Sequence, residues 1–162
     1  MRQILIIPIL CYIFQLMEYC LFTLFGRWGD PHLMLLLVIF FNLYSGIRFS
    51  LLVAICGGIL KDCFSTMPFG THIFSYMVCA CLSTFIRKHW YERGSPVSKL
   101  MMVFMLTMAH TLIMAFVFKM VFEDIRMFDV FAGIWLPEMI TTMVVALFVF
   151  EKLIALARRF KL

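Results

Sequence analysis

The chain has 162 residues, of which 64% are hydrophobic and only 14% are charged, and its formal net charge is +5. A typical soluble domain is about half apolar and about a quarter charged, so this composition excludes an ordinary soluble protein and indicates a membrane protein. At about 20 residues per span, the length leaves room for five or six transmembrane helices and for no soluble domain of useful size.

Apolar runs succeed one another along the whole chain and predict an all-α, polytopic membrane helix bundle in a single integral membrane domain, residues 1–162. The first run is too long for a cleaved signal peptide and contains Gln15 and Glu18, so we expect it to be a retained helix. We predict six spans, with five as the alternative, at about residues 4–25, 31–45, 47–62, 70–86, 100–122 and 130–153.

A polar break at Ser45-Gly46 decides between six spans and five. Residues 33–60 as one helix would be about 42 Å long, whereas the hydrocarbon core is about 30 Å thick. That helix would also leave Arg48 near the middle of the membrane, at a cost of about 2.5–3.5 kcal/mol. Two short helices joined at the surface avoid this cost, and a five-span arrangement would have to explain Arg48.

The distribution of basic residues predicts the orientation, because Lys and Arg accumulate in short cytoplasmic loops. With both termini in the cytoplasm, ten of the 14 basic residues face that side and four face the outside. This bias explains the positive charge without a nucleic-acid partner. We expect contact with membrane lipid from the basic residues Arg87, Lys88, Arg93, Lys99, Arg158 and Arg159.

The stretch GGILKDCFSTMPFGTH, residues 57–72, interrupts the apolar pattern and lies on the outer face in this orientation. Gly57 and Gly58 permit another helix to approach closely, and Pro68 and Gly70 are turn formers. Asp62 lies near a helix C-terminus, where its charge opposes the helix dipole. We therefore expect N–H groups at the start of the next helix to bind its carboxylate.

The order of these residues resembles the MreD family of bacterial rod shape-determining membrane proteins. A helix opening with Pro31 is followed by a basic turn, a second helix that ends in Gly-Gly-Ile-Leu-Lys-Asp, and a short loop with a glycine before the next helix. The resemblance is sharp over residues 31–76 and marks Gly58, Asp62, Pro68 and Gly70 as a structural signature or partner contact.

Membership of that family would imply a multi-pass protein of the bacterial inner membrane that maintains cell shape. It would bind MreC, a partner with one span and an external coiled coil, and act with the RodA glycosyltransferase and a penicillin-binding transpeptidase in peptidoglycan synthesis. The family carries no assigned catalytic residue and no cofactor. Its fold is similar to the six-helix S-components of vitamin transporters.

Three polar residues inside the predicted spans require explanation, since ionisable groups in a membrane are costly. Glu18, His110 and Glu138 have depths at which they meet if their helices are neighbours. The expected role is interhelical hydrogen bonding that fixes the packing, and the alternative is a proton or substrate pathway.

Three functions remain open from the sequence. The favoured one is a non-catalytic scaffold of the elongation machinery, and no catalytic motif, metal-ligand cluster or phosphate-binding loop contradicts it. A substrate-binding transporter component would retain a small molecule in a polar pocket near Glu18, Glu138 and the outer loops. An enzyme that acts on lipid would lose activity when Glu18, His110 or Glu138 is substituted.

Overall fold

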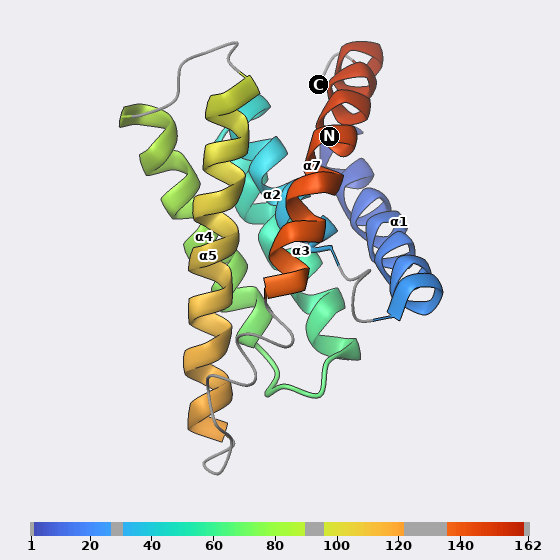
Figure 1. The fold of residues 1–162 in the computed structure, drawn as a ribbon. Coiled ribbons are helices and arrows are strands. Elements are labelled where there is room, and N and C mark those ends of the chain that lie inside the picture. Colours follow the sequence, from blue (N-terminus) through green and yellow to red (C-terminus); the bar gives the residue numbers. More distant parts are fainter. Residues whose placement is uncertain (1, 27–30, 90–95, 122–135, 161–162) are drawn as a thin grey trace.

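The computed structural model describes residues 2–26, 31–89, 96–121 and 136–160, and within them it contains six helices and no strand (Figure 1). This confirms the predicted all-α class, and the start of the sixth predicted span, residues 130–135, lies outside the described residues. The helices are α1 (Arg2–Phe25), α2 (Leu33–Tyr44), α3 (Ile47–Phe64), α4 (Thr71–His89), α5 (Pro96–Val121) and α7 (Leu136–Phe160).

Helix α2 lies at the centre of the bundle and contacts each of the other five helices (Figure 1). Around it, α1 packs on α3, α3 on α4, α4 on α5, and α5 on α7. Every residue from Leu33 to Asn42 is buried, which matches a helix that is apolar on all sides. With 12 residues α2 is about 18 Å long. The bundle is therefore built around a short central helix that the other described helices enclose.

The break at Ser45-Gly46 is present, and it separates α2 from α3 as predicted. The backbone N–H groups of Ser45 and Gly46 both donate to the carbonyl of Phe41, at 2.9 Å each. Gly46 has φ of 92°, a conformation that glycine adopts without steric cost. The chain therefore reverses here in a tight helix cap.

Asn42, near the C-terminal end of α2, joins this central helix to α4. Its side-chain amide donates to the carbonyl of Ala80 at 2.9 Å and to the hydroxyl of Thr84 at 2.8 Å. Arg87 of α4 donates to the backbone carbonyl of Asn42. The end of α2 is thus held by three polar contacts from one neighbouring helix.

We expect Asn42→Leu to lower the free energy of unfolding by about 0.5–2 kcal/mol, because interhelical hydrogen bonds in membrane proteins are worth this much. Thr84→Val removes one of the two side-chain contacts and should cost less. Thermal unfolding of both variants in one detergent measures the difference, and equal melting temperatures for wild type and Asn42→Leu would contradict the expectation.

Two of the described helices contain a stretch long and apolar enough to cross a membrane, namely residues 6–23 of α1 and 97–121 of α5. Residues 33–44 and 138–150 form shorter apolar helices. The charged residues of α3 and the basic end of α4 lower the hydropathy of these two helices. The helix count is therefore as expected, while six full spans remain a prediction.

Candidate functional site

The carboxylate of Asp62 is the centre of the hairpin between α3 and α4. One oxygen accepts hydrogen bonds from the N–H groups of Gly70 at 2.9 Å and Ile73 at 3.3 Å, and the other accepts from the N–H of His72 at 3.0 Å. The imidazole Nδ1 of His72 lies 2.8 Å from the same carboxylate. These contacts confirm that the start of the next helix binds Asp62, which is buried.

The two glycines of α3 lie against two different helices. A Cβ atom built on Gly58 would lie 2.5 Å from the backbone Cα of Ile73 in α4, and one on Gly57 would lie 3.1 Å from the sulfur of Met34 in α2. The predicted close approach is therefore present at both positions. At Gly58 the neighbour is backbone, so the approach depends on the missing side chain.

The remaining signature residues shape the loop before α4. The carbonyl of Pro68 accepts from the N–H of Thr71 at 3.3 Å and from its hydroxyl at 2.7 Å. Gly70 has φ of 101°, which disfavours any other residue. The turn therefore directs three backbone N–H groups, those of Gly70, His72 and Ile73, at Asp62.

A polar cluster lies in the interior where α2, α3, α4, α5 and α7 meet. His110 contacts the hydroxyl of Ser75 at 2.6 Å and stacks on the ring of Tyr76 at 5.2 Å. Glu138 lies 3.5 Å from the imidazole of His32. Both His110 and Glu138 line one cavity of about 150 Å³, so two of the three predicted polar residues share a site.

Glu18, the third, is on the other side of Lys61. Its carboxylate is only 2% exposed and pairs with the ammonium group of Lys61, which also lines the small cavity. Lys61 therefore links Glu18 to the cluster that contains His110 and Glu138.

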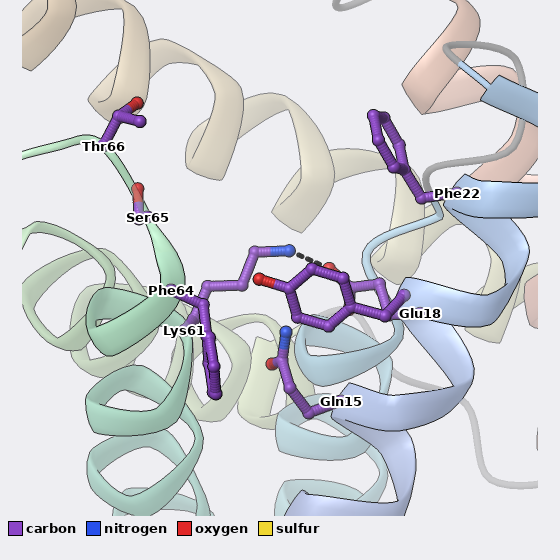
Figure 2. Close-up of a pocket in the computed structure, with 8 residues that line it drawn as sticks. Gln15, Glu18, Phe22, Lys61, Phe64, Ser65 and Thr66 are labelled. Carbon is purple, nitrogen blue, oxygen red and sulfur yellow. Dashed lines mark hydrogen bonds and ion pairs between the residues drawn. The ribbon is translucent and has the colours of Figure 1, made fainter.

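A larger cavity of about 490 Å³, which we call the α1–α3 pocket, opens between α1 and the C-terminal end of α3 (Figure 2). In Figure 2, Gln15 and Glu18 of α1 point toward Lys61, which reaches across from α3. The pocket is completed by the loop residues Ser65 and Thr66 and by the aromatic residues Tyr19, Phe22 and Phe64.

Substitution of Lys61 by Met should lower the free energy of unfolding by about 2 kcal/mol, because a buried charge would lose its partner. The double variant with Glu18→Leu should recover most of this loss, since it leaves neither charge behind. A double-mutant cycle measured by thermal unfolding tests the pair. Additive losses for the two single variants would contradict it.

The predicted basic surface is only partly described. Lys88 is exposed, Lys99 is partly exposed in the first turn of α5, and Arg87 turns inward to the end of α2. Arg93 lies outside the described residues, as do the side chains of Arg158 and Arg159 at the end of α7. Within the described residues, no group of three or more His, Cys, Asp or Glu side chains forms a metal site.

Comparison with known proteins gives the family. The model of the rod shape-determining protein MreD matches residues 1–160. The chain belongs to the MreD family. No curated protein and no solved structure shows a significant match.

MreD proteins are membrane proteins that determine rod shape, and the family is not one of known enzymes. The match extends well beyond residues 31–76, which carried the resemblance, because it includes α1, α5 and α7 as well. The membrane location of the family agrees with the two long apolar helices of this member.

Sequence reasoning missed Lys61, His32 and His72 as members of the polar sites. Lys61 was expected on the outer side and His72 at the start of the fourth span without a partner being named, whereas the structure pairs Lys61 with Glu18 and His72 with Asp62. A usable signal existed for Lys61. A carboxylate within a span needs a partner, and Lys61 is near the same predicted depth as Glu18.

Proposed function

We propose that this MreD protein is a non-catalytic, multi-pass scaffold of the bacterial inner membrane that serves cell elongation. It binds an MreC-like coiled-coil protein with one span and, directly or through that partner, helps to position or regulate a RodA-type glycosyltransferase and a penicillin-binding transpeptidase. The observation that carries the proposal is the family match over residues 1–160.

The contacts of the polar residues support a structural role. Glu18 pairs with Lys61, Glu138 with His32, and His110 with Ser75, so each binds a side chain from another helix or, for His32, from the N-cap of one. Such contacts fix how helices pack. The hairpin around Asp62 presents exposed residues beside this rigid frame, including Phe64 and Phe69 at 61% and 69% exposure. We propose it as a contact for the partner.

Depletion of the protein in its native bacterium tests the role. Rod-shaped cells should become spherical, and wild-type protein purified in mild detergent should retain an MreC-like protein with one span. Rods of normal width after complete depletion would overturn the proposal, as would a purified complex that lacks any such partner.

A substrate-binding component of a vitamin-type transporter is the second candidate, and the α1–α3 pocket favours it. The pocket lies near Glu18 and the outer loop, where that function requires a polar cavity. Mass spectrometry of the purified protein distinguishes the two candidates, because a transporter component would retain a small solute at one copy per chain.

A further inference from the structure

Two acceptor atoms in the α1–α3 pocket lack a hydrogen-bond donor among the described residues. They are Oε1 of Gln15 and Oε2 of Glu18, and their residues are 4% and 2% exposed. Lys61 binds only the other oxygen of Glu18. Buried acceptors without partners are rare in proteins. Both belong to residues that line the pocket, side by side on α1 (Figure 2), and a ligand with N–H groups would satisfy both.

The opposite side of the pocket supplies donors. Lys61 is 18% exposed, and its ammonium has three N–H groups of which Glu18 takes one. The hydroxyl oxygen of Ser65 accepts the N–H of Met67 at 3.1 Å, which leaves its O–H free to donate. The pocket therefore offers acceptors on α1 and donors at the end of α3, a pattern that complements a zwitterion.

The rim and the adjoining surface are apolar. Tyr19, Phe22 and Phe64 are between 41% and 61% exposed, and the rings of Tyr19 and Phe64 pack edge to face at 5.6 Å. Aromatic faces attract a cation. Toward the other end of α1, the exposed residues are again apolar, with Ile9 at 62% and Ile13 at 46% exposure. A ligand with a polar head and long apolar chains fits both parts.

We propose that the α1–α3 pocket binds the headgroup of a zwitterionic aminophospholipid of the phosphatidylethanolamine type. Its ammonium group donates to Gln15 Oε1 and Glu18 Oε2, and its phosphate accepts from Lys61 and Ser65. The acyl chains lie along the exposed face of α1. The volume of about 490 Å³ is in the range of small-molecule sites.

Three lipid headgroups distinguish the effect of the ammonium N–H groups from the effect of the positive charge alone. A choline headgroup keeps the positive charge but has no N–H, and a glycerol headgroup has no cation. Delipidated protein is incubated with equal amounts of phosphatidylethanolamine, phosphatidylcholine and phosphatidylglycerol with the same acyl chains, and bound lipid is counted by native mass spectrometry. We expect about tenfold preference for phosphatidylethanolamine, from two further hydrogen bonds. Equal retention of the three lipids overturns the proposal.

Variants localise the preference. Gln15→Leu is close in size and should reduce the preference to about threefold by removing one of the two acceptors. Glu138→Gln is the matched control for Glu18→Gln, because it makes the same change at a carboxylate that does not line the pocket, and it should keep the full preference. The lipid preference of Glu18→Gln is measured in the same assay, and size-exclusion chromatography tests whether this variant is folded. An unchanged preference in folded Gln15→Leu overturns the site.

Soluble phosphoethanolamine tests the source of the headgroup. We expect it not to displace the bound lipid at equal concentration, because it lacks the chains that cover α1. Complete displacement would assign the pocket to a free zwitterion and overturn the lipid assignment. The assay uses the purified chain without partners, so its failure leaves the scaffold role unaffected.

Discussion

Gly58→Ala should destabilise the protein by about 3 kcal/mol, at the upper end of the range for overpacking. The new Cβ would lie 2.5 Å from the backbone Cα of Ile73 and 2.8 Å from its backbone nitrogen. Backbone cannot change rotamer, so α3 and α4 must separate. That movement would also pull Asp62 away from the N–H groups at the start of α4.

Gly57→Ala is the matched control for this experiment. It makes the same chemical change one residue earlier, with the same gain in helix propensity, but its Cβ would meet the side-chain sulfur of Met34 at 3.1 Å. A methionine side chain adapts to such a contact, so we expect a change within about 1 kcal/mol. Thermal unfolding in detergent compares the two variants, and equal stabilities would show that the α3–α4 approach does not depend on Gly58.

Asp62→Ala should destabilise the protein by about 3–5 kcal/mol. The variant removes the acceptor of three backbone N–H groups, each of which costs about 1–3 kcal/mol if left unpaired in a buried site. It also removes the partner of the His72 imidazole. We expect lower accumulation in the membrane and cells that lose their rod shape.

Ser65→Ala is the control within the same hairpin. It removes one hydrogen bond, from the N–H of Met67, at a half-buried position that water can reach. The free energy of unfolding should fall by less than about 1 kcal/mol. Asp62→Asn keeps one acceptor oxygen and should fall between the two. Wild-type melting temperature and cell shape in Asp62→Ala would refute the role of the carboxylate.

Local chemistry made the hairpin and the break before α3 predictable. Asp62 at a helix end needs donors, a glycine pair predicts close packing, and Arg48 cannot lie in the middle of a span, so each feature followed from the residue itself. The same reasoning did not place α2 at the centre. Its sequence is apolar on every side, so it contains no signal for which faces meet protein.

Contacts between distant helices were the least predictable part of the candidate sites. His32 follows Pro31 in a stretch that resembles a helix start, yet its N–H donates to Thr142 at 3.1 Å and its ring lies 3.5 Å from Glu138. These pairs are more than 100 residues apart in the chain, and helix periodicity says nothing about them. The pocket is likewise formed by residues of α1 and α3 that meet only in the folded bundle.

The enclosure of α2 has a consequence for biosynthesis. This helix is synthesised well before α7, which contributes Thr142 to the hydrogen bond at His32. A nascent chain therefore holds a short apolar helix with one side uncovered until α7 has been synthesised and packs against it. A chain that stops before α7 would therefore leave part of α2 uncovered and the N–H of His32 without Thr142.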